Sequence, residues 1–126
     1  MKLSELKSTY YFHESTIEKI TYDKSAKKVV LEITFCRWIQ DWYDEEKDAE
    51  IETLVLTFEN VSKTDCSNYT AGMYDEILSC ELIVDECFGE GVAFSNTAEN
   101  DFFVITIFAD EVLVEHRENK NRNQPR

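Results

Sequence analysis

The sequence predicts a mainly β protein of six to seven short antiparallel strands, arranged as a meander, a curled sheet, a sandwich or a partly open barrel. Two observations lead to this prediction. Several segments alternate apolar and polar residues with a period of two, which is typical of a strand with one buried face. No region shows the alternation of strands and amphipathic helices that a parallel sheet requires. At most one or two short helices are expected, one of them over residues 3–10.

The clearest strand in the first half covers residues 29–36, where every second side chain is apolar and β-branched residues are frequent. A polar segment at 23–27 separates it from an alternating segment at 19–22, and this spacing predicts that the two strands pair as a hairpin. A further strand is expected at 53–59, beyond an acidic loop.

Four further strands are expected in the second half, at 77–85, 92–94, 103–107 and 111–115. The last two predict a second hairpin through Ala109 and Asp110, although this pair is not among the preferred tight-turn dipeptides. In the segment 77–85, Leu78 and Leu82 fit one face of a strand and also the stripe of a helix that includes Tyr74 and Ile77. The strand is the favoured interpretation.

The length of 126 residues predicts one β domain over residues 1–117, followed by a disordered polar tail at 118–126. The opening residues lack an apolar signal segment and no apolar run reaches the length of a membrane span, so a cytoplasmic location is expected. In that compartment the four cysteines stay reduced, and their spacing matches no zinc pattern. We therefore expect no disulfide, no bound metal and no cofactor.

The net charge of −13 is distributed unevenly along the chain. Residues 64–116 carry twelve acidic side chains and no basic one. Such a field repels nucleic acid and anionic membranes and attracts a basic protein, so neither nucleic acid nor membrane is expected as a partner. An alternative interpretation is that the acidity only keeps the protein soluble.

The acidic loop contains both tryptophans, Trp38 and Trp42, at the end of the clearest strand. Aromatic residues are common interface anchors, and neighbouring carboxylates steer a basic partner toward them. The alternative is that the tryptophans fold back and plug one end of the core, an interpretation favoured for Trp38 and evenly balanced for Trp42 and Tyr43. The predicted partner-binding residues are Asp41, Trp42, Tyr43, Asp44, Glu45 and Glu46.

No nucleophile elbow, phosphate loop or zinc helix is present, so no catalytic residue is predicted. The two histidines, His13 and His116, stand outside any known metal or nucleophile spacing. We expect His116 to pack at the end of the sheet. A turn formed by His13, Glu14 and Ser15 is a second candidate for a functional segment.

Two short motifs carry a resemblance to a known group of proteins. The first is Phe12-His13-Glu14-Ser15-x-Ile17, followed by Ile20-x-Tyr22 and the strand from Val29 to Phe35, and the second is Leu54-x-Leu56-x-Phe58-Glu59-Asn60-Val61. Together they resemble small bacterial β proteins that open with a His-Asp/Glu-Ser turn before a hairpin. Some of those proteins resemble immunity proteins, which neutralise polymorphic toxins. The resemblance implies a β fold and no catalytic residues.

Three functions follow from these observations as hypotheses. The leading one is a non-enzymatic acidic binding protein, such as an immunity-type inhibitor of a basic toxin. The second is a structural or housekeeping β domain that forms a homodimer through its edge strands. The third is a hydrolase-like enzyme that uses His13 with a nearby carboxylate.

Overall fold

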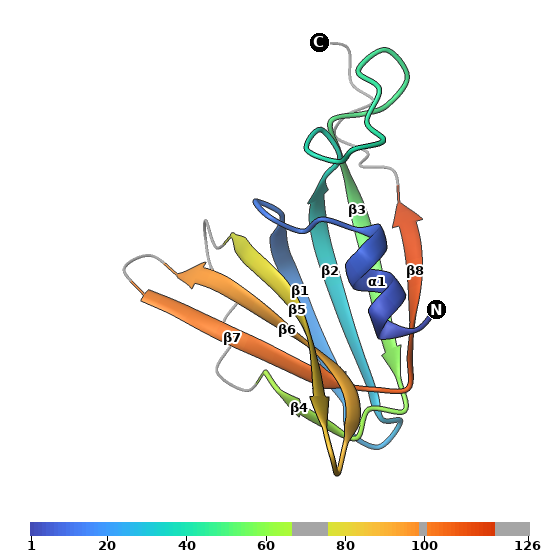
Figure 1. Ribbon diagram of the computed structural model, residues 1–126, viewed down its shortest axis with the longest axis vertical. Coiled ribbons are helices and arrows are strands. Elements are labelled where there is room, and N and C mark those ends of the chain that lie inside the picture. Colours follow the sequence, from blue (N-terminus) through green and yellow to red (C-terminus); the bar gives the residue numbers. More distant parts are fainter. Residues whose placement is uncertain (67–75, 99–100, 118–126) are drawn as a thin grey trace.

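The computed structural model describes residues 1–66, 76–98 and 101–117, which form one short helix and eight strands (Figure 1). The elements are α1 (Leu3–Thr9), β1 (Thr16–Asp23), β2 (Lys28–Cys36), β3 (Ile51–Glu59), β4 (Lys63–Asp65), β5 (Ile77–Asp85), β6 (Gly89–Ala98), β7 (Asp101–Phe108) and β8 (Glu111–Arg117). The prediction of a mainly β fold is confirmed. The structure has one strand that was not predicted, β4, whose three residues are too few to show an alternating pattern. The predicted tail at 118–126 and the predicted helical position Tyr74 lie outside the described residues.

The first sheet has the strand order β1-β2-β3-β8, and all its neighbours are antiparallel. The predicted hairpin of β1 and β2 is confirmed, with Tyr22 opposite Val29. The alternating side chains of β2 and β3 point inward as predicted and are fully buried, namely Val29, Leu31, Ile33, Phe35, Leu54, Leu56 and Phe58. This face of the sheet forms one wall of the core.

The second sheet has the order β4-β7-β6-β5, and it corrects one prediction. We expected β7 and β8 to pair as a hairpin through Ala109 and Asp110, but they belong to different sheets. Ala109 is buried, and its N–H donates to the carbonyl oxygen of Glu90. The N–H of Asp110 donates to the carbonyl oxygen of Glu59. The two residues therefore form a corner that carries the chain from one sheet to the other. Neither residue is the glycine that favours a tight two-residue hairpin turn.

The segment 77–85 is a strand, as favoured, and it pairs with β6. The pairing register of β5 with β6 shifts between Ile77 and Ser79. As a result, the side chains of Cys80 and Leu82 pack against the core while Leu78 is exposed. The expectation that Leu78 shares a face with Leu82 was wrong because a bulge inserts one residue and reverses the side-chain alternation.

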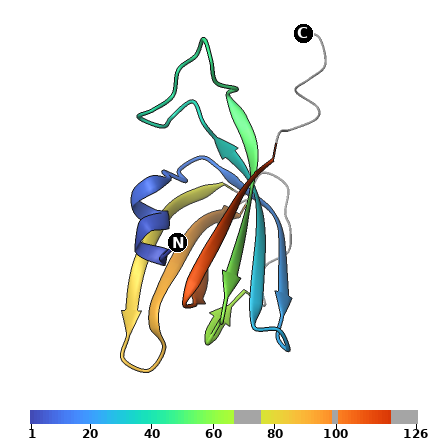
Figure 2. The same cartoon turned by 90° about the vertical axis from the view of Figure 1, so that its right-hand side faces the viewer.

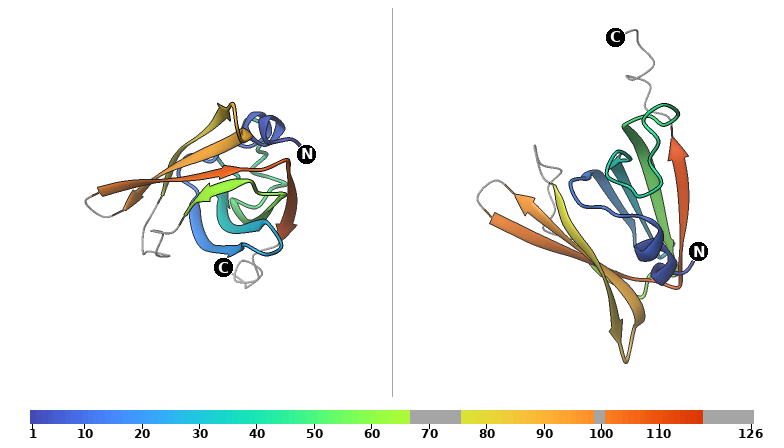
Figure 3. Two further views of the ribbon diagram at one scale, coloured as in Figure 1. Left: turned by 90° about the horizontal axis from the view of Figure 1, so that it is seen from below. Right: turned by 45° about the horizontal axis from the view of Figure 1, so that its top comes forward.

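The two sheets and α1 enclose one hydrophobic core. The helix contributes Leu3 and Leu6, both fully buried. Figure 2 shows α1 beside β5 and β6, at one side of the space between the sheets, and Figure 3 shows that the sheets cross at a steep angle. Within the described ranges, no helix has the length and apolar character needed to cross a membrane. The loop from 37 to 50 extends beyond the ends of β2 and β3, away from the packed core (Figure 1).

The four cysteines carry free thiols in different surroundings. Cys87 is exposed in the turn between β5 and β6. Burial raises the pKa of Cys80, on the preceding strand, to about 12. Because the thiolate is the reactive form, the two thiols differ in reactivity as well as in access.

We expect iodoacetamide at pH 8 to alkylate Cys80 at least about tenfold more slowly than Cys87 in the native protein, since a thiol with a pKa near 12 is almost entirely protonated there. The rate at Cys80 should rise as pH rises. Timed quenching followed by peptide mass spectrometry measures both rates, and the same reaction in denaturant is the control, where the two rates should converge. Equal rates in the native protein would contradict the placement of Cys80.

Candidate functional site

The loop from 37 to 50 is held by the guanidinium of Arg37, which lies just after β2. Its Nη1 donates to Glu52 Oε2 at 2.7 Å, and its Nη2 donates to Asp48 Oδ1 at 2.8 Å. The other carboxylate oxygen of Asp48 accepts from the backbone N–H of Asp44 at 2.9 Å. The guanidinium also lies 5.1 Å from the ring centroid of Trp42, as a cation–π contact. One side chain thus connects both ends of the loop to its aromatic residue.

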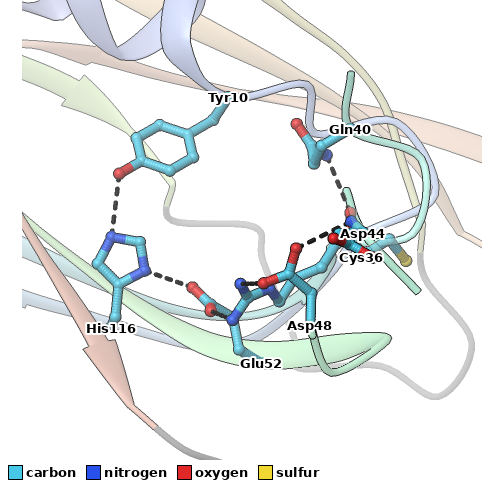
Figure 4. A network of polar contacts seen from close by, with 8 residues as sticks. Tyr10, Cys36, Gln40, Asp44, Asp48, Glu52 and His116 are labelled. Carbon is cyan, nitrogen blue, oxygen red and sulfur yellow. Dashed lines mark hydrogen bonds and ion pairs between the residues drawn. The ribbon is translucent and has the colours of Figure 1, made fainter. Parts of the chain in front are cut away.

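Glu52 is the buried centre of this network. It stands in the inward-facing row of β3, two residues before Leu54, and only 7% of its side chain is exposed. A buried carboxylate needs compensating charge and hydrogen bonds. Arg37 supplies these on one side, and His116 Nδ1, from β8, lies 2.5 Å from Glu52 Oε1 on the other (Figure 4).

The network continues to Tyr10, at the end of α1. The Tyr10 hydroxyl lies 3.1 Å from His116 Nε2 (Figure 4). With the tautomer in which Nδ1 donates to Glu52, Nε2 accepts a hydrogen bond from the Tyr10 hydroxyl. Burial raises the pKa of Tyr10, and the Glu52 carboxylate raises it further. The phenol is therefore kept protonated, which suits a structural hydrogen bond better than an activated nucleophile. His116 does lie near the end of the sheet, as expected, but its side chain is about half exposed.

Gln40 attaches the same loop to the segment between α1 and β1. Its side chain is buried, and its Oε1 accepts from the Tyr11 N–H at 3.0 Å while its Nε2 donates to the Tyr11 carbonyl oxygen at 2.7 Å. Nε2 also donates to the Cys36 carbonyl oxygen at 2.9 Å (Figure 4). The backbone of Tyr11 is thus fixed on both sides, while its side chain is 58% exposed.

The predicted partner-binding residues all lie in this loop, and most of them face solvent. Trp42 is 46% exposed, Tyr43 and Asp44 are half-buried, and the remaining three, Asp41, Glu45 and Glu46, are exposed. Trp38 is 49% exposed. The favoured interpretation of Trp38 as a core plug is therefore wrong, because Phe12 and Phe35 already fill the interior at this end and pack edge to face.

Two open grooves flank Tyr11. The first, of about 400 Å³, lies between the helix end and the loop, and its lining includes Lys7, Tyr11, Asp41 and Trp42. The second, of about 350 Å³, lies against β5 and is lined in part by Tyr11, His13, Leu78, Cys80 and Glu81. The structure thus brings the predicted loop and the predicted turn to adjacent grooves, although 25 or more residues separate them in the chain.

The turn at His13, Glu14 and Ser15 joins the two sheets. Glu14 has a φ of 68°, a left-handed conformation that is uncommon outside glycine. Its N–H donates to the carbonyl oxygen of Ile77 on β5, and the N–H of Ile77 donates to the carbonyl oxygen of Ser15. Ser15 is fully buried, and its Oγ accepts from the Cys36 N–H at 3.0 Å. These contacts give the turn a structural role.

The histidine of this turn is held by two neighbours. Its Nδ1 lies 3.0 Å from the Leu78 carbonyl oxygen, and its ring stacks on Tyr11 with centroids 5.8 Å apart. Neither neighbour is a carboxylate. In the part of the chain that the structure describes, no three His, Cys, Asp or Glu side chains gather closely enough to hold a metal ion.

Sequence reasoning missed Glu52, Arg37, Tyr10 and Gln40. The position of Glu52 held a detectable signal, since it has the same parity as Leu54 and Leu56 and thus belongs to the buried row. The partners of Glu52 held no such signal, because Arg37 and His116 lie 15 and 64 positions away from it in the chain.

Replacing Ser15 by alanine should lower the free energy of unfolding by about 1–3 kcal/mol, because the Cys36 N–H loses its acceptor. Urea denaturation measures the change. Ser8→Ala, at an exposed serine of α1, is the matched control and should change stability by less than about 0.5 kcal/mol. If Ser15→Ala were as stable as the parent, the turn would not have the structural role assigned above.

Replacing Arg37 by methionine should lower the free energy of unfolding by about 3 kcal/mol, because the buried Glu52 carboxylate loses its cationic partner. Lys47→Met removes an exposed cation from the same loop and should have an effect below about 0.5 kcal/mol. Similar stabilities of the two variants in urea would show that the Arg37–Glu52 pair is not needed to hold the loop.

The two short motifs on which the expected resemblance rests lie mainly in the turn between the sheets and in β1, β2 and β3. Their residues are mainly buried or bonded through their backbone. The motifs therefore belong to the framework more than to the exposed loop. No family model, no curated protein and no solved structure matches the chain.

Proposed function

We propose that this chain is a non-enzymatic binding protein that engages a basic protein, in the manner of an immunity-type inhibitor of a toxin. The contact surface is formed by residues 41–46 of the loop together with the groove beside Tyr11. One observation carries the proposal above the others: Trp42 stays half exposed although Arg37 and a network around a buried carboxylate hold the loop that bears it. A fixed, exposed aromatic side chain is a typical anchor of a protein interface.

The preorganisation of the loop favours binding because little conformational entropy is lost when a partner arrives. Both ends of the loop are connected through Arg37 and Asp48, and its middle is attached to Tyr11 through Gln40. Trp42 and Tyr11 both line the same groove, so a partner can contact the two rings together.

The charge of the loop supports a basic partner. Residues 37–50 carry six acidic and two basic side chains. Arg37, one of the two cations, is paired with both Asp48 and Glu52. The exposed carboxylates of Asp41, Glu45 and Glu46 therefore dominate the surface around the aromatic residues and attract a positively charged surface.

The homodimer hypothesis has less support from the edge strands. A bulge interrupts β1 next to the charged pair Glu18 and Lys19, and another interrupts β5. Bulges and charges are features that protect an edge from pairing with another chain. The edge of β8 is partly occupied, because the N–H of Val112 donates to the Met1 carbonyl oxygen.

The hypothesis of an enzyme based on His13 also has less support. The described contacts of His13 are a backbone carbonyl oxygen and a tyrosine ring. A histidine that acts as a general base is usually oriented by a carboxylate. Among the described hydrogen bonds, the histidine beside a carboxylate is His116, which contacts Glu52.

The proposal is tested by binding kinetics with a basic protein that co-purifies with this chain or is found encoded beside its gene. Trp42→Ala should raise the dissociation rate about 30-fold, as expected for a buried hot spot of about 2 kcal/mol. Trp38→Ala is the matched control, since Trp38 has a similar exposed fraction but does not line the groove. Its dissociation rate should stay within about threefold of the parent.

Replacing Glu45 and Glu46 by glutamine should act on a different rate. The association rate should fall, and its dependence on salt should weaken, because long-range attraction is screened beyond a Debye length of about 8 Å at physiological salt. Thermal melting of every variant is the control for folding. If Trp42→Ala binds as the parent does but melts at a markedly lower temperature, Trp42 is part of the core and the proposed surface is wrong.

A further inference from the structure

Two aromatic side chains and a carboxylate share the groove between the helix end and the loop. Tyr11 lines the groove from the segment after α1, and Asp41 and Trp42 line it from the loop. The groove is open and its volume of about 400 Å³ exceeds that of a single large side chain. We infer that this groove receives an arginine side chain of the basic partner and prefers arginine to lysine. The inference rests on the function proposed above and names the chemistry that the site recognises.

The electrostatics of the groove favour a cation. Lys7 is the one cation among the described lining residues, and its Nζ lies 3.3 Å from Glu81 Oε2, so its charge is already paired. Among the described ion pairs, none includes Asp41. The carboxylate of Asp41 is exposed and can pair with an incoming charge.

The aromatic lining favours a guanidinium over an ammonium. A guanidinium is planar and weakly hydrated, so it stacks on aromatic faces while its N–H groups donate to a carboxylate. An ammonium is compact and strongly hydrated, and it gains less from such a surface. The protein already shows this recognition internally, since Arg37 lies over the Trp42 ring while it donates to Asp48 and Glu52.

Arg37 also limits where the incoming side chain can lie. It covers one face of the Trp42 ring, yet 46% of the residue remains exposed. Trp42 also lines the groove. Gln40 bonds the backbone N–H and carbonyl oxygen of Tyr11, and the Tyr11 ring stacks on His13 with centroids 5.8 Å apart. The two rings are thus fixed before the partner binds, which lowers the entropic cost of binding.

Two peptides of equal length and charge test the inference, one made only of arginine and one only of lysine. Isothermal titration of the full chain at physiological salt should show at least about fivefold tighter binding of the arginine peptide. Trp42→Ala should reduce this preference to about twofold or less, and Trp38→Ala should leave it unchanged. Equal affinities for the two peptides, or a preference that survives in a folded Trp42→Ala, would overturn the inference.

Asp41→Asn provides a second variant if Trp42→Ala fails to fold. It keeps the size of the side chain and should weaken binding of the arginine peptide at least about threefold. Glu90→Gln is the control, at an exposed carboxylate near the start of β6, and it should leave the affinity for the peptide unchanged. An unchanged affinity in Asp41→Asn would count against the groove.

The failure of this inference can be separated from the failure of the proposed function. If the partner binds the parent and loses affinity with Trp42→Ala, but arginine-to-lysine replacements on its surface have no effect, the preference for arginine is wrong and the binding function stands. If the parent does not bind the basic partner at all, the proposed function is wrong as well.

Discussion

The buried carboxyl group of Glu52 is the constraint on which the geometry of the site depends. It lies in a row of apolar side chains and is 7% exposed, so it needs partners within the protein. The partners are the Arg37 guanidinium and the His116 ring, which stand on different elements. Because Arg37 also contacts Asp48 and Trp42, bonding one buried carboxyl group fixes the loop that carries the exposed aromatic residue.

A second constraint holds the two sheets together at the same end of the molecule. The turn at 13–15 connects β2 and β5 through the buried Ser15 and the backbone of Glu14, whose left-handed φ is maintained by these bonds. The preceding residues, Tyr10 and Tyr11, belong to the same short connection. Their positions thus depend on the sheet junction on one side and on Gln40 of the loop on the other.

Much of the fold could be predicted from the sequence because alternation is a local signal. The buried rows of β2 and β3 followed from parity, and Glu52 extends the same row one residue before the predicted strand. The corner at Ala109 could not be predicted in this way, because its hydrogen bonds to the backbone of Glu90 and Glu59 depend on the packing of two sheets. The contact of Tyr10 with His116 is equally non-local. In the loop, composition identified the exposed acidic residues but not the buried side chains that hold them.

The division of charge within the loop explains how one short segment can be both rigid and attractive to a partner. Arg37 is used in ion pairs with Asp48 and Glu52, which are buried or half-buried. The described ion pairs leave out Asp41, Glu45 and Glu46, so these carboxylates keep their charge on the surface. Rigidity then comes from the inner carboxylates and long-range attraction from the outer ones. Since the outer carboxylates take no part in the described network around Glu52, neutralising them removes surface charge and leaves the contacts that hold Trp42 in place.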